Sequence, residues 1–196
     1  MSGAEVATTA RLRLRELSCD DDAFVVELLN DEAFLRFIGD RGVRDPEGAR
    51  AYLREGPLAS YQSHGFGLWR VEQREDATAI GMCGLLQRPQ LDAPDIGFAY
   101  LPEFRANGYG TEAARAVIRL ARERFQLPRV LAVTQEDNRA SIALLARLGM
   151  TRAGSARLEP DGPDLELYEL RFDERATPES AANRSAVPSS GRCATP

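Results

Sequence analysis

The stretch that decides the fold is F-A-Y-L-P-E-F-R-A-N-G-Y-G-T-E-A, residues 98–113. An apolar strand ends at Pro102, a loop that contains arginine and glycine follows, and a helix then begins. The start of a helix exposes unpaired backbone N–H groups and the positive end of the macrodipole, which together attract an anion. Gly108 and Gly110 let the backbone approach such an anion closely, and Arg105 adds a fixed positive charge. The stretch therefore predicts a cradle for a pyrophosphate.

The segments on either side of this loop alternate between strand and helix patterns. Strict alternation in R-L-R-L-R-E-L (11–17) indicates a strand with one buried face, and the apolar run R-V-L-A-V-T (129–134) indicates a central buried strand. Further strands are predicted at 65–72, 79–86, 95–101, 150–158 and 165–172, and helices at 20–30, 32–37, 46–53, 111–125 and 139–148. This order predicts an α/β domain with a mixed sheet, in which the clear crossover unit spans 95–134.

Composition limits the chemistry more than it limits the fold. The 196 residues include 30 acidic and 25 basic side chains, and every basic residue is arginine. The absence of lysine excludes a P-loop and a Schiff-base mechanism. His64 is the one histidine, so no metal site can be built from two or three histidines, and we expect no metal. The net charge of -5 argues against nucleic acid as the partner.

The length fits one domain, which we place at residues 11–172. Residues 1–10 are expected to form a flexible leader. Residues 173–196 contain no leucine, isoleucine, methionine or aromatic residue, so they are expected to form a disordered tail. The sequence shows no secretory signal and no apolar run long enough to span a bilayer, and its three cysteines lack metal-site spacing. These features favour a cytoplasmic protein with no membrane partner.

Gly108, Gly110 and Ala113 also satisfy the dinucleotide-binding pattern G-x-G-x-x-A. The surroundings do not match that pattern, because Pro102 ends the preceding strand six residues before Gly108. A dinucleotide-binding fold turns directly from the strand into the first glycine. The next strand reads V-L-A-V-T-Q and does not end in the acidic residue that would contact a ribose. A dinucleotide-binding oxidoreductase is therefore the weaker alternative.

A closer match exists for two separate motifs. R-A-N-G-Y-G (105–110) resembles the R/Q-x-x-G-x-G/A motif of the GNAT acyl-CoA N-acetyltransferases. N-R-A-S-I-A-L-L-A-R-L-G-M (138–150) is similar to their second signature, and the helix and buried strand between the motifs match the family's spacing. The opening R-L-R-L-R-E-L, the strand around Trp69 and the late Y-E-L are similar to the RimJ/RimL subgroup. The resemblance covers residues 11–172.

The resemblance implies a mixed, mostly antiparallel central sheet with splayed middle strands, flanked by helices. It also implies acetyl-CoA as co-substrate, bound in a V-shaped opening between the strands at 95–101 and 129–134. The pantetheine arm would lie along Phe98, Ala99 and Tyr100, and the diphosphate against the glycine loop and the helix start. The positions that match the family's cofactor-binding residues are Phe98, Ala99, Tyr100, Arg105, Ala106, Asn107, Gly108, Tyr109, Gly110, Thr111, Asn138 and Ser141.

Two of these residues have alternative structural roles. Asn138 matches the asparagine that contacts the pantetheine arm or the sulfur region, and asparagine is also a favourable helix N-cap. Ser141 occupies the subgroup's serine position and could hydrogen-bond the departing thiolate, but a serine in a first helical turn also bonds to backbone. The sequence departs from the family at Leu145 and Val133, where relatives carry a tyrosine acid or a glutamate.

Acetyl transfer to an amine requires a neutral amine, so a base or a chain of waters must accept a proton. The family often places an acid at the head of the strand that lines the cofactor, which here is Asp95. Glu159, Glu136 and Asp137 are rivals for this role. A backbone N–H freed by a bulge at 97–100 could donate to the developing oxyanion. No enzyme nucleophile is required, which fits direct attack in a ternary complex.

We therefore expect an N-acetyltransferase that moves an acetyl group from acetyl-CoA to a primary amine, either a protein N-terminus or a small molecule. A non-catalytic acyl-CoA-binding or regulatory relative is the alternative that Leu145 and Val133 favour. Selection of the acceptor is expected from the early helices, residues 20–61, and from the final hairpin. The resemblance implies a monomer or a homodimer.

Overall fold

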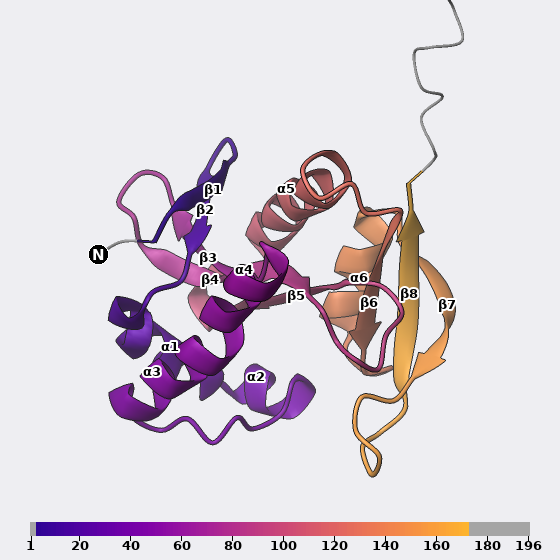
Figure 1. The fold of residues 1–196 in the computed structure, drawn as a ribbon, viewed down its shortest axis with the longest axis horizontal. Coiled ribbons are helices and arrows are strands. Elements are labelled where there is room, and N and C mark those ends of the chain that lie inside the picture. Colours follow the sequence, from indigo (N-terminus) through magenta and orange to yellow (C-terminus); the bar gives the residue numbers. More distant parts are fainter. Residues whose placement is uncertain (1–2, 173–196) are drawn as a thin grey trace, which may run out of the picture.

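The computed structural model describes residues 3–172 (Figure 1), and the expected disordered tail at 173–196 lies outside the described residues. The strands are β1 (Glu5–Thr8), β2 (Leu12–Glu16), β3 (Leu68–Gln73), β4 (Ala79–Leu86), β5 (Asp95–Tyr100), β6 (Arg129–Thr134), β7 (Thr151–Ala156) and β8 (Leu165–Arg171). The α-helices are α1 (Asp22–Leu29), α2 (Glu32–Phe37), α3 (Pro46–Leu53), α4 (Ala59–His64), α5 (Tyr109–Glu123) and α6 (Arg139–Arg147). Two 3-10 turns, η1 (Cys19–Asp21) and η3 (Pro102–Phe104), and one π-helical turn, η2 (Arg54–Leu58), complete the described elements.

The strands of residues 3–172 form one sheet in the order β1-β2-β3-β4-β5-β6-β8-β7. Every neighbouring pair is antiparallel except β5 and β6, which are parallel and are joined by the crossover helix α5. β5 and β6 each have six residues but pair at one position, Asp95 with Leu131, and then diverge. The predicted mixed, mostly antiparallel sheet with splayed middle strands is confirmed. The same topology contradicts a doubly wound, dinucleotide-binding fold, whose sheet is mostly parallel.

Helices cover both faces of the sheet (Figure 1). Consecutive residues of a strand point to opposite faces, and along β4 Met82 and Cys83 belong to two different apolar clusters. The cluster around Met82 includes residues of α1, α2 and α3, whereas the cluster around Cys83 includes residues of α5 and α6. The site-bearing helices α5 and α6 therefore share one face, opposite α1 and α3. None of the described helices has the length and apolar character needed to cross a membrane.

The first strand differs from the expectation of a flexible leader at 1–10, because residues 5–8 form β1. β1 pairs antiparallel with β2, with Thr8 opposite Arg13. The Glu16 N–H also donates to the Ala4 carbonyl at 2.8 Å. A four-residue edge strand carries too little periodicity to be recognised by itself, and it forms here because β2 supplies its hydrogen-bonding partner.

Local sequence signals account for the elements whose bounds agree with the prediction, namely α2, α3, β4 and β6. The Asp31 side chain accepts hydrogen bonds from the first turn of α2, and Pro46 opens α3 behind the capping residue Asp45. The pattern does not predict α4. Pro57 lies between α3 and α4 and would normally end a helix, but the π-helical turn η2 accommodates it and the chain continues as α4.

A buried network of charged side chains ties β2 to β3 and to η1. Arg15 Nη1 and Nη2 donate to Asp21 Oδ2 and Oδ1 at 2.9 and 2.6 Å, and Arg70 Nη1 lies 2.5 Å from Asp21 Oδ1. Arg15 Nε also donates to Glu72 Oε2 at 3.3 Å. Alternation in β2 predicts only one buried face, yet Arg15 is 6% exposed and Asp21 2%. The second face is buried at this point because η1 brings Asp21 over Arg15.

We predict that Asp21→Asn lowers the free energy of unfolding by about 3–5 kcal/mol, because it removes one of the two buried acids that pair with Arg15 and Arg70 and leaves both arginines to share Glu72. Burial alone would raise the pKa of the Asp21 carboxyl, but hydrogen bonds from Arg15, Ser18 and Arg70 outweigh it and hold that pKa below its ordinary value. The stabilisation is therefore complete above the ordinary aspartate pKa of about 4 and is lost as the pH falls through the lower, folded-state value.

Urea unfolding of both proteins between pH 7 and pH 2.5 measures the effect. The exposed Glu55→Gln variant is the control, and its unfolding free energy should stay within about 0.5 kcal/mol of the unsubstituted protein at pH 7. An Asp21→Asn protein as stable as the control would contradict a stabilising role for this network.

Candidate functional site

One edge of β5 faces the gap that opens between β5 and β6. The Leu101 N–H donates to the Ile80 carbonyl at 3.0 Å, towards β4. Because peptide groups alternate along a strand, the N–H and C=O groups of Phe98 and Tyr100 point the other way, towards β6. β4 and β5 pair along the whole of β5 without a register shift. The bulge expected at 97–100 is therefore absent from this pairing, and the divergence of β6 is what leaves the Phe98 groups facing the gap.

The loop between β5 and α5 turns through two residues with positive φ. Ala106 has φ 61° and Gly108 has φ 80°, both in the left-handed region. Gly108 is the N-cap of α5 and has no side chain with which to cap the first turn. The first-turn N–H groups of Tyr109, Gly110 and Thr111 have no partner within the helix, and the positive end of the α5 macrodipole lies at the same point. This geometry suits an anionic ligand.

The two glycines of the motif have different structural roles. At Gly108 a Cβ would find open space apart from Arg11 Nη2 at 3.5 Å, so the requirement there is the positive φ and an open approach. At Gly110 a Cβ would lie 2.9 Å from Leu144 Cδ1 and 3.3 Å from Tyr100 Cε2. Gly110 therefore allows α5 to pack closely against α6 and β5, and it is Gly108 that opens the backbone to a ligand.

Arg105 is already engaged by neighbouring groups. Its Nε donates to the Tyr100 carbonyl at 2.8 Å, and its Nη2 forms an ion pair with Asp31, the residue that caps α2. Asn107 is exposed, and its side-chain amide donates to the Arg105 carbonyl at 3.1 Å. The predicted positive charge therefore lies at the loop, held there by an acid that arrives from α2.

Arg11 contacts the same loop from the start of β2, although no local sequence signal indicates this contact. Its Nη1 donates to the Asn107 carbonyl at 3.1 Å, and its Nε donates to Glu112 Oε2 at 2.7 Å. Glu112 Oε1 accepts from the Thr9 hydroxyl at 2.6 Å and from the Arg11 N–H at 2.9 Å. The acid in the first turn of α5 thus anchors the helix to the turn between β1 and β2.

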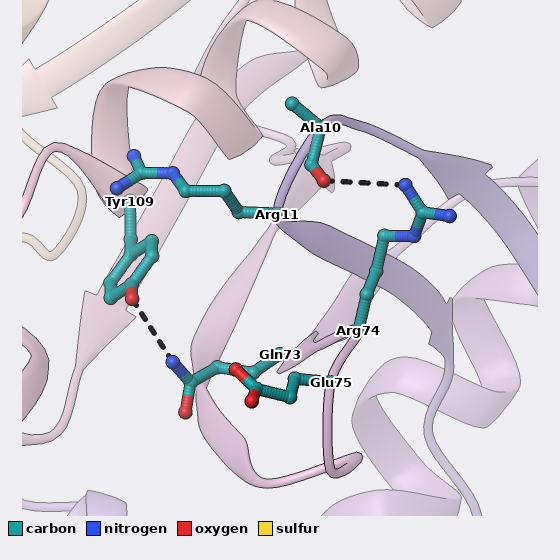
Figure 2. A pocket seen from close by; sticks show the side chains of 6 residues that line it. All are labelled: Ala10, Arg11, Gln73, Arg74, Glu75 and Tyr109. Carbon is teal, nitrogen blue, oxygen red and sulfur yellow. Dashed lines mark hydrogen bonds between the residues drawn. The ribbon is translucent and has the colours of Figure 1, made fainter.

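Tyr109 lies on the outer side of the helix start, where Arg11 and Gln73 hold it. The Arg11 guanidinium lies 4.4 Å from the centre of the Tyr109 ring, and Gln73 Nε2 donates to the Tyr109 hydroxyl at 3.0 Å. Figure 2 shows both side chains beside the tyrosine, at the rim of an open hollow of about 380 Å³ that Arg74 and Glu75 also line. The Tyr109 side chain therefore packs on β3, away from the gap between β5 and β6.

Asn138 and Ser141 open the other helix of the site. Asn138 follows β6 and caps α6, and its Oδ1 accepts from the Ser141 N–H at 3.1 Å. Both side chains are partly exposed at the carboxyl end of β6. The capping alternative for Asn138 is the interaction present in this structure.

Asp95 lies where β5 and β6 still pair. Its carboxylate is 1% exposed and accepts from Arg88 Nε at 2.9 Å through Oδ1 and 3.1 Å through Oδ2. Burial raises the pKa of the Asp95 carboxyl, while Arg88 acts in the opposite direction. Within residues 3–172, no group of three or more histidine, cysteine, aspartate and glutamate side chains is placed to hold a metal ion.

The rival acids lie in more exposed positions. Glu136 and Glu159 are exposed, and Asp137 pairs with Arg36 at 2.8 Å. The two apolar departures from the family pattern have packing roles. Leu145 is fully buried in the core beneath α6, and Val133 packs against a third apolar cluster that lies beside β6 and β8.

Helix α2 contacts both sides of the gap. At its N-terminus Asp31 pairs with Arg105 of the loop that follows β5. At its C-terminus, Arg36 pairs with Asp137 after β6, and Gln135 Nε2 donates to the carbonyl of Arg36 at 3.1 Å. Residues that follow the two diverging strands are therefore connected through one short helix, a connection that the sequence does not reveal.

Comparison with known proteins identifies the family. A family model described as an acetyltransferase (GNAT) domain matches residues 11–151. The chain is 26% identical over 147 residues to the uncharacterized N-acetyltransferase YnaD of Bacillus subtilis, covering 75% of this chain and 83% of that protein.

Two solved structures have a similar fold. An acetyltransferase from Agrobacterium tumefaciens superposes with a TM-score of 0.71 at 24% identity, covering 88% of this chain and 96% of that one. RimL, a ribosomal L7/L12 alpha-N-protein acetyltransferase, superposes with a TM-score of 0.73 at 16% identity, covering 86% and 94%. The splayed sheet, the uncapped glycine start of α5 and the family match together mean that this chain belongs to the GNAT acetyltransferases and that it is an acyltransferase enzyme.

Proposed function

We propose that this enzyme transfers the acetyl group of acetyl-CoA to a primary amine, by direct attack in a ternary complex. Members of the GNAT family use acetyl-CoA as co-substrate. The observation that carries the proposal is the start of α5, where unpaired N–H groups and an open Gly108 lie beside the gap between β5 and β6. Backbone N–H groups at a helix start suit a diphosphate, and the exposed edge of a strand suits the amides of a pantetheine arm.

The proposed binding residues act mainly through their backbone. In this proposal the N–H groups from Gly108 to Thr111 receive the diphosphate, and the Phe98 N–H and C=O face the pantetheine arm, with Ala99 and Tyr100 beside them. Arg105, Ala106 and Asn107 shape the loop, and Asn138 and Ser141 approach the thioester from the start of α6. The co-substrate supplies an activated acetyl carbon and a thiol leaving group.

Two side chains are proposed to handle protons. Asp95 accepts the proton of the amine through water, since its carboxylate is 1% exposed and cannot meet the acceptor directly. Its raised pKa makes it a stronger base than an ordinary aspartate. The Ser141 hydroxyl hydrogen-bonds the departing thiolate. An α-amine, with a pKa of about 7.7–8.0, loses its proton more easily than a lysine amine at about 10.4, so a protein N-terminus or a small amine of similar pKa is the proposed acceptor.

A non-catalytic acyl-CoA-binding relative is the second candidate, favoured by the apolar side chains at Leu145 and Val133. Release of free thiol from acetyl-CoA across a panel of peptides and small amines separates the two candidates. We expect amine-dependent release that rises with the fraction of neutral amine. Binding of acetyl-CoA without release for any amine would instead support the non-catalytic candidate.

We predict that Gly108→Glu raises the Kd for acetyl-CoA by roughly 100-fold, measured by calorimetry. The substitution places a side chain at φ 80° and a negative charge where the diphosphate is proposed to bind. Gly149→Glu is the matched control, since Gly149 has φ 79° and open space around it but lies at the end of α6. Equal affinity in the Gly108→Glu protein would mean that the phosphates bind elsewhere.

We predict that Asp95→Asn lowers kcat/KM by about 10²- to 10⁴-fold. The activity of the unsubstituted enzyme should rise with pH as Asp95 loses its proton, with a midpoint above the ordinary aspartate pKa because burial raises it. This part of the pH profile should be missing in the variant. Glu136→Gln and Glu159→Gln serve as controls for the rival acids. A loss of the same profile in either control, with Asp95→Asn unaffected, would move the base to that position.

A further inference from the structure

We propose that Arg11 is a positioning residue for the co-substrate site, because it fixes the orientation of the peptide group between Asn107 and Gly108. The inference rests on the proposed function, since it concerns how the loop presents an N–H group to the diphosphate. Arg11 lies outside both sequence motifs, and most of the domain's sequence separates it from Asn107. Its role depends on contacts that only the folded chain brings together.

The contact with Asn107 sets the direction of the next N–H group. Arg11 Nη1 donates to the Asn107 carbonyl at 3.1 Å. In a planar trans peptide, the C=O of one residue and the N–H of the next point in opposite directions. With the Asn107 carbonyl turned towards Arg11, the Gly108 N–H is turned away from it. If this peptide flipped, a carbonyl oxygen would occupy the place of a donor and would repel an anion.

The loop needs such an external contact because its own backbone conformation is unfavourable. Ala106 has φ 61°, which costs free energy for a residue with a Cβ, and Gly108 at φ 80° has many alternative conformations available. The Asn107 side chain bonds only within the loop, to the carbonyls of Arg105 and Glu103. Arg11 connects this loop to the sheet.

The charge of Arg11 is balanced where it lies. Arg11 Nη2 is 2.7 Å from Glu112 Oε2, and Glu112 also accepts from Arg11 Nε and from the Thr9 hydroxyl. Burial alone would raise the pKa of the Glu112 carboxyl, but these bonds outweigh it and lower that pKa, so the carboxyl stays ionised. Because an ionised acid neutralises the guanidinium, orientation of the loop rather than attraction of the ligand is the main contribution of Arg11.

The surroundings of Arg11 are themselves held in place. The Arg11 Cζ lies 4.4 Å from the centre of the Tyr109 ring, and the Tyr109 hydroxyl accepts from Gln73. The turn that precedes Arg11 is held by Arg74, whose Nη1 donates to the carbonyls of Thr9 and Ala10 at 3.0 and 3.2 Å. Figure 2 shows Arg11 extending from the turn towards Tyr109, with Arg74 on the other side of the turn. The guanidinium of Arg11 thus reaches Asn107 and Glu112 from a turn that is itself held in place.

The test compares Arg11→Met with Arg11→Lys. For both variants, we expect the Kd of CoA, measured by calorimetry, and the KM for acetyl-CoA to rise about tenfold, with kcat changed by less than about twofold. Lysine should not restore binding, because one ammonium group cannot bond Asn107 and Glu112 with the geometry of a guanidinium. Turnover of acetylpantetheine, a thioester without a diphosphate, should be unchanged in both variants.

The exposed Arg115→Met variant is the matched control, because it removes one positive charge from α5 and should leave CoA affinity unchanged. Failure of the unsubstituted enzyme to bind CoA would overturn the proposed function itself. If the unsubstituted enzyme binds CoA and Arg11→Met binds it equally well, the positioning role is wrong. Restoration of affinity by lysine, or an equal loss of acetylpantetheine turnover, would also overturn it, since the first indicates simple charge and the second a damaged fold.

Discussion

The separation of β5 from β6 beyond the Asp95–Leu131 pair is the constraint on which the rest of the site depends. Parallel neighbours in a sheet normally satisfy each other's peptide groups, so a gap between them leaves an edge that needs other partners. Both strands run in the same direction, and each is followed by a helix, so α5 and α6 begin at the open end of one gap. The free edge of β5, the uncapped start of α5 and the Asn138 cap of α6 therefore lie together because of a single topological feature. The helix α2 then connects the segments that follow the two strands, through Asp31 and Arg36.

Much of this fold could be predicted because its elements carry strong local signals. α2 and α3 begin at capping aspartates, and β4 and β6 are short, nearly continuous apolar runs bounded by polar residues. The predictions fail for elements whose stability depends on residues outside their own local sequence. β1 has four residues and depends on β2, and α4 follows a proline that a π-helical turn accommodates. Arg15 lies in an alternating strand that predicts one exposed face, and only the folded chain brings Asp21 over it.

The candidate site, like the fold, has one part that the sequence predicts and one part that it does not. The loop and the start of α5 were predictable because glycines and a strand-to-helix change are local features, although Gly110 proves to serve the packing of α5 against Leu144 and Tyr100. The groups that hold the loop were not predictable. The partners in these contacts are far apart in the sequence, as in the pairs Arg11–Glu112 and Arg105–Asp31. The chain has many arginines and many acids, and residue type alone does not show which of them pair. The place of Asp95 at the head of a strand is a local feature of the sequence, whereas its burial against Arg88 depends on how the loop after β4 folds back.

All the ion pairs described for residues 3–172 use a guanidinium as the cation. Arginine stays protonated and is a poor nucleophile, whereas a lysine amine can be acylated and then loses its charge. An enzyme that handles an activated acetyl donor exposes its own surface to that reagent. Because the contacts of Arg11, Arg15 and Arg105 rest on groups that do not react with a thioester, the scaffold is chemically resistant to the group it transfers.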